Sequence, residues 1–188
     1  SELSRNLDGY RISTFIHKNK DSKGGKITMG PYWDYDICFG NANFFSAGQT
    51  EGWIIDGMGD ADQYAMPFWW QKFRLDPFFN DQLKKRWNVW TDKYINNTYL
   101  NHVIDSCANQ LADAQKRNFQ TWNILNTYLW PNNYVGGTYA NEISYLKNWL
   151  SNRITWMNSQ IQAIQDLPDG LVQENLPMDI VTYPNPFV

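Results

Sequence analysis

The sequence predicts an α+β domain that is mostly helical and carries one β-hairpin near its start. β-Branched and aromatic residues gather in the first thirty residues, whereas apolar residues recur at helical spacing in the second half of the chain. The chain has 188 residues, of which 43% are hydrophobic and 16% aromatic. At this length about 70% of the unfolded surface becomes buried, so a core can form without disulfide bonds.

The hairpin and its flanks are predicted from residue type. Residues 1–7 resemble the last turns of a helix, and residues 10–18 are typical of a strand. The polar, glycine-ended segment 19–25 predicts a turn, after which residues 26–29 form the returning strand. Residues 32–39 are expected to continue as an extended segment.

Residues 40–66 are expected to form a long loop, because they contain repeated glycines and little periodicity. Loops of this length without regular structure are unusual and often functional.

Helices are expected in the rest of the chain, three or four in number. Asp76 at an N-cap and Pro77 in the first turn predict one helix start. A second helix is expected to begin at Thr98, to have an apolar stripe that reaches Trp122 and to be broken by residues 131–137. A third is expected to be capped by Thr138. The third has the clearest apolar stripe: Leu146, Leu150, Ile154, Met157, Ile161 and Ile164.

Composition excludes several functional classes. The chain has 16 basic and 19 acidic residues, a net charge of −3, which argues against a nucleic-acid binder. Two cysteines, Cys38 and Cys107, neither build a disulfide framework nor have zinc-site spacing. No stretch reaches the roughly 18 apolar residues of a membrane span. The first residues lack the pattern of a signal peptide, so we expect a fragment of a longer protein.

Two carboxylates follow the hairpin. In an extended segment Asp34 and Asp36 would point to the same face, where mutual repulsion requires a cation or a shared proton. Oxygen ligands of this kind suit Mg²⁺ or Mn²⁺. The alternative is that Asp34 caps a turn and Asp36 forms an ordinary ion pair, and spacing alone favours this alternative.

A third carboxylate, Asp8, precedes the hairpin at a turn before Gly9. A hairpin brings its two ends together, so Asp8 and Asp34 are expected to meet at its base. One acid to orient a hydroxyl and one to hold a metal is what phosphoryl transfer needs from such a region. The alternative is that Asp8 only caps its turn.

Other residues leave alternatives open. Four tryptophans form either a sugar-stacking face or, more commonly at helical spacing, part of the core: Trp69, Trp70, Trp87 and Trp90. Asn96 begins a sequence of glycosylation form, but a helix cap is preferred. Arg86 and Arg153 are candidates for pairing with an acid of the site. The two histidines, His17 and His102, are each expected to be a surface or hydrogen-bonded histidine rather than a catalytic base.

A combination of motifs resembles the spore-coat protein H (CotH) kinase family. The segments are ELSRNLDGYRIS at residues 2–13, GPYWDYD at residues 30–36 and FGN at residues 39–41. LKNWLSNR at residues 146–153 is similar to the closing helix of that family. The resemblance extends from residue 1 to about residue 165, and it is the combination of segments that makes it specific.

The resemblance implies an atypical protein-kinase-like fold, ATP as phosphoryl donor, Mg²⁺ or Mn²⁺, and a protein substrate with a Ser or Thr acceptor. It implies that Asp8 is the catalytic-loop acid and that Asp34 binds metal. Asp36 is a candidate second metal ligand, and Asn41 is a candidate for approaching the phosphates.

The chain departs from ordinary kinases at one position. Ser13 stands five residues after Asp8, where an Asn usually holds a second metal, and either Ser13 or Asn6 is a candidate substitute. The glycine-rich loop, strand Lys and helix Glu of a kinase are not found. We therefore expect residues 1–167 to be a C-terminal lobe, inactive or nearly so alone, and residues 168–188 to be an extended linker.

The linker contains YPNPF at residues 183–187, which resembles the opening of modules found in bacterial secreted proteins. This implies an extracellular or cell-surface parent. Two other functions remain open: an aromatic-rich module that binds glycan or cell-surface material, including a degenerate kinase lobe without turnover, and a purely structural surface protein.

Overall fold

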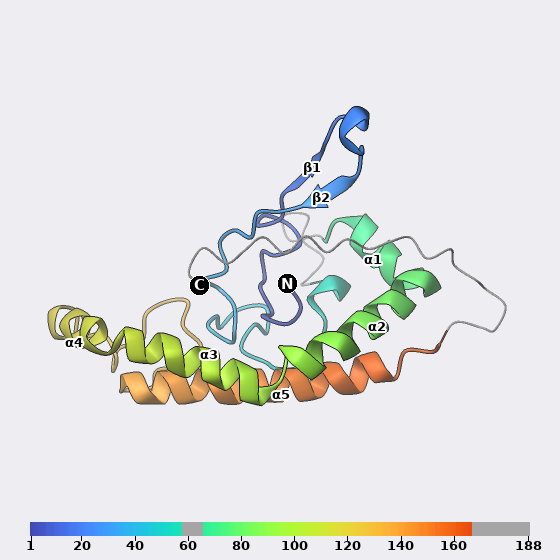
Figure 1. Cartoon of the computed structure of the whole chain (residues 1–188). Coiled ribbons are helices and arrows are strands. Elements are labelled where there is room, and N and C mark those ends of the chain that lie inside the picture. The colour runs from blue at the N-terminus through green and yellow to red at the C-terminus, as the bar shows by residue number, and fades with distance from the viewer. Residues whose placement is uncertain (58–65, 167–188) are drawn as a thin grey trace.

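A computed structural model describes residues 1–57 and 66–166. These residues form a two-stranded hairpin, two short 3-10 helices and five α-helices (Figure 1). The predicted linker at residues 168–188 lies outside the described part. The elements are β1 (Ile16–Lys18), η1 (Asp21–Lys23), β2 (Ile27–Met29), η2 (Ile54–Asp56), α1 (Phe68–Leu75), α2 (Pro77–Lys93), α3 (Asn97–Gln110), α4 (Ala112–Thr121) and α5 (Tyr139–Gln162).

The hairpin is present but shorter than predicted. β1 pairs with β2 in antiparallel register, with Ile16 opposite Met29. The prediction of a strand from residue 10 is wrong for its first part, because residues 10–13 belong to a turn rather than a strand. Local β-propensity was overridden there by hydrogen bonds from the N–H groups of Arg11, Ile12 and Ser13 to the carbonyl of Asp8.

The helix starts follow capping chemistry. Asp76 accepts a hydrogen bond from the backbone N–H of Phe78, as predicted for an N-cap followed by proline. Thr138 caps α5 in the same manner. Asn96, not Thr98, caps α3, which confirms the capping interpretation of Asn96.

The second predicted helix is two helices. α3 ends and α4 begins at Leu111, whose ψ of 0° leaves the helical range. The prediction of one continuous helix to Trp122 was therefore wrong, because apolar periodicity continues across the break and does not report a backbone turn.

α5 is the structural base of the molecule. It runs alongside both α2 and α3 (Figure 1). One hydrophobic cluster joins α2 to α5 through Trp87, Ile95, Met157 and Ile161. The buried stripe predicted for α5 is thus confirmed at its C-terminal half.

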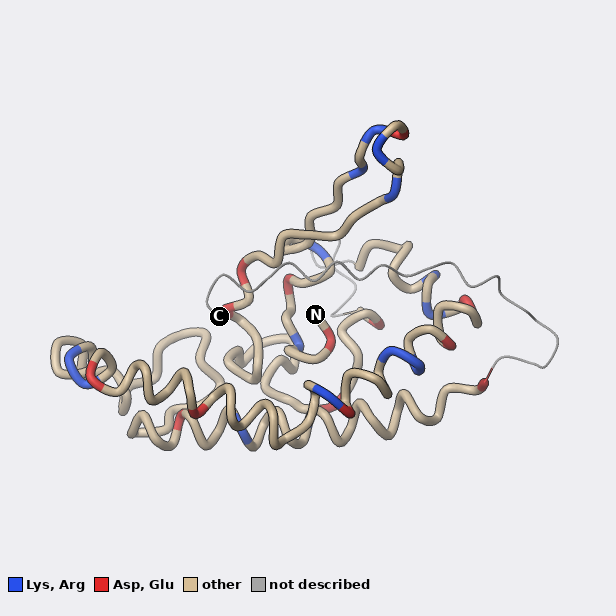
Figure 2. Tube along the Cα trace, in the orientation of Figure 1, with Lys and Arg blue, Asp and Glu red and all other residues tan. Residues whose placement is uncertain are grey.

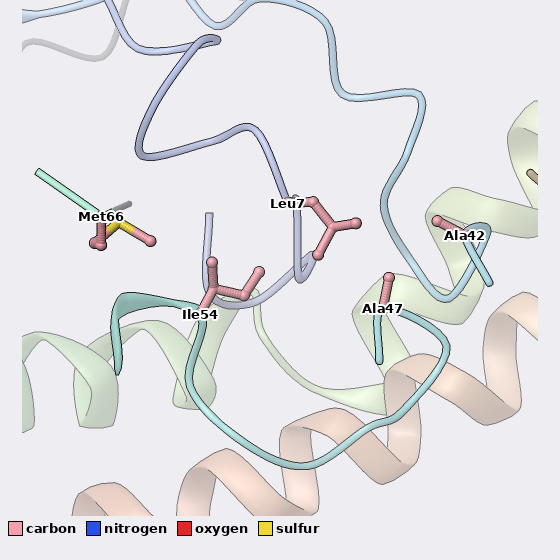
Figure 3. Close-up of a cluster of buried hydrophobic side chains, with 5 residues drawn as sticks. All are labelled: Leu7, Ala42, Ala47, Ile54 and Met66. Carbon is pink, nitrogen blue, oxygen red and sulfur yellow. The ribbon is translucent and has the colours of Figure 1, made fainter. Parts of the chain in front are cut away.

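A second cluster lies among irregular segments above α5. It consists of Leu7, Ala42, Ala47, Ile54 and Met66 (Figure 3). Residues 1–7 form turns and not the predicted end of a helix. The glycine-rich segment after residue 40 was predicted as a loop, and its described part supplies Ala42, Ala47 and Ile54 to this core.

Charged residues are unevenly placed on this frame. The tube view shows lysines gathered at the tip of the hairpin, while the helices carry scattered charges of both signs (Figure 2). Within the described residues, no helix combines the length and the apolar character that a membrane span needs.

Candidate active site

Asp8 lies in a tightly bonded turn at the start of the hairpin. Its backbone carbonyl accepts from the N–H groups of Arg11, Ile12 and Ser13, at 3.1, 3.0 and 2.9 Å. Its carboxylate Oδ1 is 2.8 Å from Nη2 of Arg11, and both side chains are mostly covered. The carboxylate therefore has a defined position, because both its backbone and its side chain are held.

Asn6 connects this turn to the segment that follows the hairpin. Its side chain is fully buried. Oδ1 accepts from the backbone N–H of Asp8 at 3.1 Å, and Nδ2 donates to the backbone carbonyl of Asp34 at 3.3 Å. One amide side chain thus joins the backbones of the two acids.

Ser13 reaches the same carbonyl. Its Oγ is 3.5 Å from the carbonyl oxygen of Asp34, at the outer limit of a hydrogen bond. The two ends of the hairpin therefore meet at the backbone of Asp34, while the convergence of the Asp8 and Asp34 carboxylates stays a prediction. Asn6 and Ser13, the two residues weighed as substitutes for the usual catalytic-loop Asn, both contact this one carbonyl.

The segment around Asp34 is not extended. Asp34 has a φ of 59°, in the left-handed region that non-glycine residues seldom adopt. The alternation that would place Asp34 and Asp36 on one face therefore does not apply, and that part of the prediction was wrong. The side chain of Asp34 is exposed to solvent.

Asp36 and Asn41 belong to one local turn. Oδ1 of Asp36 accepts from the backbone N–H of Ile37 at 2.9 Å. Nδ2 of Asn41 donates to the backbone carbonyl of Asp36 at 3.3 Å. Both side chains are exposed, and no ion pair of Asp36 is found in the described residues.

The carboxylates of Asp34 and Asp36 are the candidate ligands for a divalent metal ion. Among residues 1–57 and 66–166, no three His, Cys, Asp or Glu side chains converge as a set of metal ligands. Mg²⁺ is commonly held by one or two protein carboxylates together with phosphate oxygens and water. Exposed carboxylates at Asp34 and Asp36 fit this shared kind of coordination, and they do not form an all-protein metal cage.

α5 holds the segment that follows these acids. The phenolic hydroxyl of Tyr145 donates to the carbonyl of Gly40 at 3.1 Å, and Nε1 of Trp149 donates to the carbonyl of Gly48 at 2.9 Å. A Cβ at Gly40 would lie 2.4 Å from Trp149, and Gly40 has a φ of 79°. Only glycine allows this approach without displacement.

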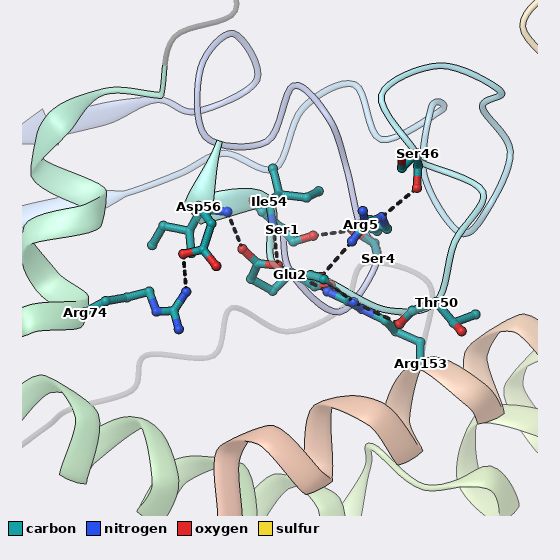
Figure 4. A network of polar contacts seen from close by, with 12 residues as sticks. Ser1, Glu2, Ser4, Arg5, Ser46, Thr50, Ile54, Asp56, Arg74 and Arg153 are labelled. Carbon is teal, nitrogen blue, oxygen red and sulfur yellow. Dashed lines mark hydrogen bonds and ion pairs between the residues drawn. The ribbon is translucent and has the colours of Figure 1, made fainter. Parts of the chain in front are cut away.

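A buried polar network fixes the N-terminal segment on α5 (Figure 4). Arg153 is fully buried and donates to the carbonyls of Glu2, Thr50 and Gly52 at 2.7–3.0 Å. Its Nη2 also lies 3.2 Å from the carboxylate of Glu2. Burial lowers the pKa of Arg153 to about 10, while the nearby Glu2 carboxylate opposes that shift.

The same carboxylate continues the network. Glu2 accepts from the backbone N–H groups of Ile54 and Ile55, at 3.1 and 2.8 Å. Arg5 adds a donor to the carbonyl of Gly52 at 2.7 Å. Of the arginines considered as partners of a site acid, Arg153 therefore pairs with Glu2, and its role is to hold the backbone that carries Asn6 and Asp8.

α1 contacts the site from the other side. Nε1 of Trp70 donates to the carbonyl of Tyr10 at 3.0 Å, and the two rings lie 5.0 Å apart. Trp87 is buried in the core, whereas Trp69 and Trp90 are exposed. Trp70 and Trp87 thus have structural roles, and the four tryptophans do not behave as one sugar-stacking set.

Comparison with models of known protein families shows to which family this chain belongs. A family model described as CotH kinase protein matches residues 1–157. The chain belongs to the CotH kinase family. No curated protein and no solved structure matches the chain.

CotH membership covers every candidate site residue. The matched range includes the turn of Asp8, the hairpin, the segment from Asp34 to Asn41, and α5 as far as Met157. At family level it supports a kinase-like enzyme that uses ATP and a divalent metal and acts on a protein.

Sequence reasoning missed two residues of this CotH site. Arg11 was not singled out, although its position three residues after Asp8 permits a contact within one turn. The second is Trp70, which was considered only as core or as part of a sugar-stacking face; its contact with Tyr10 joins positions 60 residues apart and has no local signal.

Proposed function

We propose that this chain is the C-terminal lobe of a secreted CotH-family protein kinase, with a kinase-like fold, that transfers the ATP γ-phosphoryl group to a Ser or Thr hydroxyl. The observation that carries the proposal is the single buried side chain of Asn6 bonded to the backbones of both Asp8 and Asp34. Phosphoryl transfer depends on the positioning of the reactants and on electrostatic stabilisation. An enzyme that catalyses it therefore needs its two acids held in a fixed relative position.

Asp8 orients the acceptor hydroxyl and accepts its proton in this proposal. Support comes from its defined position: three N–H groups hold its carbonyl, and Arg11 holds one carboxylate oxygen. A positioned carboxylate of this kind contributes about 10² to 10⁴ in rate when it acts as a general base.

In this proposal Asp34 and Asp36 supply oxygen ligands to Mg²⁺ or Mn²⁺, and Asn41 is the residue assigned to approach the phosphates. When bound, the metal neutralises charge on the transferring phosphoryl group. Support comes from the exposure of both carboxylates and from the contact between Asn41 and Asp36. Asn6 and Ser13 orient Asp34 through its carbonyl and are positioning residues.

The lobe alone is expected to be inactive or nearly so, because the glycine-rich loop and the phosphate-binding Lys of kinases are not found in it. We also propose an extracellular or cell-surface location, on the resemblance of residues 183–187 to secreted modules. Immunodetection of the parent protein in culture medium and cell fractions tests the location.

The kinase proposal is tested by phosphoryl transfer from labelled ATP, with Mn²⁺ or Mg²⁺, by a protein that contains this chain and an N-terminal lobe. Asp34→Ala should lower the transfer rate by at least about 100-fold, since it removes several kcal/mol of metal-assisted stabilisation. Asp92→Ala, an exposed carboxylate on α2, is the matched control and should leave the rate unchanged.

The 188-residue chain provides an independent readout. Weak Mn²⁺ binding, followed by electron paramagnetic resonance in the presence of ATP, should disappear in Asp34→Ala and persist in Asp92→Ala. Equal activity of wild type and Asp34→Ala would contradict the metal assignment. Absence of transfer together with sugar-dependent tryptophan quenching would favour the glycan-binding alternative.

A further inference from the structure

The β-hairpin projects from the body of the molecule. The view of the whole chain shows β1, η1 and β2 extending away from the helices, with only the base of the hairpin near the site (Figure 1). All six strand residues are exposed. Isolated two-stranded hairpins are marginally stable in water, and this one has no layer of the described chain covering it.

One face of the hairpin carries three apolar side chains and one lysine, because Lys18 lies on the same face as Ile16 and directly opposite Ile27. Ile16 and Met29 are directly opposite each other, and Ile27 lies two residues before Met29 on the same strand face. Their exposed fractions are 49%, 54% and 70%. Contiguous exposed apolar side chains on a projecting element are typical of an interaction surface.

The tip of the hairpin is strongly basic. Residues 16–29 contain four lysines, at 18, 20, 23 and 26, against the single carboxylate of Asp21. Lys18 is paired with Asp21 at 2.5 Å. The ion pairs found among the described residues include none for Lys20, Lys23 or Lys26. The chain as a whole has a net charge of −3, so this concentration of positive charge is local (Figure 2).

We propose that this hairpin is a docking surface for an acidic protein segment that also carries apolar side chains. Carboxylates of the segment pair with Lys20, Lys23 and Lys26 at the tip, while its apolar residues cover Ile16, Ile27 and Met29. Complementary charge steers such an encounter and sets its register, and the apolar contact supplies most of the affinity.

The distribution of side chains favours a protein partner over a lipid bilayer. Insertion into a bilayer requires apolar residues at the tip, but here the tip carries Lys20, Asp21 and Lys23. The apolar residues lie on the strands, closer to the body. Reaching the hydrocarbon with Ile16 or Met29 would first bury those charges, which is energetically unfavourable.

The hairpin lies next to the candidate active site in the sequence and in the fold. β1 begins three residues after Ser13, and Asp34 follows β2 by five residues, so a segment on the hairpin lies beside the candidate active site. The docking proposal depends only on the side chains of the hairpin. Only the further statement that the docked segment is a phosphoacceptor substrate rests on the proposed kinase function.

Binding is measured without any chemical step. The probe is a fluorescein-labelled peptide of alternating Glu and Leu with one Ser, titrated with the full 188-residue chain and followed by anisotropy. A peptide with Lys in place of Glu is the charge control. We expect saturable binding of the acidic peptide only, weakened as salt rises from about 0.05 M to 0.5 M.

Variants assign the binding to the hairpin. Lys20→Glu with Lys23→Glu should weaken binding about tenfold or more, whereas Lys72→Glu with Lys93→Glu, on α1 and α2, changes the net charge equally and should weaken it less than about twofold. Ile27→Thr keeps a β-branched strand residue and should weaken binding at constant charge. Circular dichroism checks that each variant remains folded.

Three outcomes would overturn the proposal. One is equal loss of binding in both charge variants, which indicates a non-specific charge effect. Another is unchanged binding in Ile27→Thr and in the tip variant alike. The third is absence of peptide binding together with tip-dependent sedimentation on phosphatidylcholine and phosphatidylserine vesicles, which assigns the hairpin to a lipid surface. Peptide binding by this chain, together with no phosphoryl transfer by the protein that also contains the N-terminal lobe, leaves docking intact and refutes only the proposed function.

Discussion

At the scale of single residues, Asn6 accounts for how two acids 26 positions apart share one geometry. Asparagine carries a donor and an acceptor on one planar group, so it can satisfy an N–H and a carbonyl at once. It does so from a fully buried position, where an unpaired polar group is costly. Aspartate lacks the donor and alanine lacks both groups.

Asn6→Ala should lower the free energy of unfolding by about 2–4 kcal/mol. The substitution leaves the N–H of Asp8 and the carbonyl of Asp34 without this partner, and each buried unsatisfied group costs about 1–3 kcal/mol. Urea denaturation measures the change. Asn148→Ala, at an exposed position on α5, should change the free energy by less than about 0.5 kcal/mol. Equal effects of the two would contradict the bridging role.

The buried thiol of Cys38 predicts how the stability of the protein depends on pH. Burial, reinforced by the negative charge of Asp36, raises the pKa of the Cys38 thiol from 9.0 to about 12. Because the folded pKa is above the unfolded value, the thiol's contribution to stability is complete below pH 9 and is lost as the pH rises toward 12. The slope is at most about 1.4 kcal/mol per pH unit.

The measurement compares the pH dependence of unfolding in wild type and Cys38→Ala. Stability of the wild type should fall more steeply above pH 9 than that of the variant, whose other titrating groups are the same. Parallel curves would show that Cys38 does not remain a protonated thiol in the folded state.

At the scale of elements, the packing of the irregular segment after Asp36 on α5 positions the site. Tyr145 and Trp149 lie one turn apart on α5 and bond the carbonyls of Gly40 and Gly48. Nearby Ala42 and Ala47 are buried among larger side chains. Small residues are required here because the backbone itself approaches the helix.

Gly40→Ala should destabilise the protein by more than about 2 kcal/mol. Its Cβ would meet Trp149 at 2.4 Å, and its φ of 79° is unfavourable for any L side chain. Gly24→Ala separates the two causes, since Gly24 has a φ of 96° but open space around it. We expect about 1–2 kcal/mol for Gly24→Ala by thermal denaturation. Equal losses of stability in the two variants would show that the protein accommodates the contact between the new Cβ and Trp149 without loss of stability.

At the scale of the whole molecule, Arg153 joins parts that are far apart in the chain. It lies on α5 and bonds the backbone at Glu2, Thr50 and Gly52, more than 100 positions away. It also stacks over Trp53 and Trp156. The guanidinium fork suits this task because it presents several donors in one plane.

Arg153→Met should cost about 3–5 kcal/mol, because the buried carboxylate and carbonyls that face Arg153 lose their partner. Arg153→Lys keeps a charge but not the fork, so it should lose less. Arg117→Met, exposed on α4, is the matched control and should change stability by less than about 0.5 kcal/mol. Denaturant unfolding gives all three values, and an Arg153→Met variant as stable as the control would refute the joining role.

Local signals predicted the parts of the fold that depend on local physics. The N-caps at Asp76 and Thr138 and the stripe of α5 were found from residue type and spacing. The hairpin was placed, but its first strand was set too early because the turn at Asp8 competes for the same residues. The acids of the candidate site were selected by motif rather than by geometry.

The sequence by itself determined the α+β class, the helix starts at Asp76 and Thr138, and the family, because capping, periodicity and motif are encoded within a few residues of one another. Only the tertiary structure decided that Asn6 joins Asp8 to Asp34, that the glycine-rich segment forms a core, and that Arg153 pairs with Glu2. The contact of Asn6 with Asp34 joins residues 28 positions apart, and that of Glu2 with Arg153 joins residues 151 positions apart. No local pattern specifies such a partner, since the choice depends on which groups remain to be satisfied once the chain has packed.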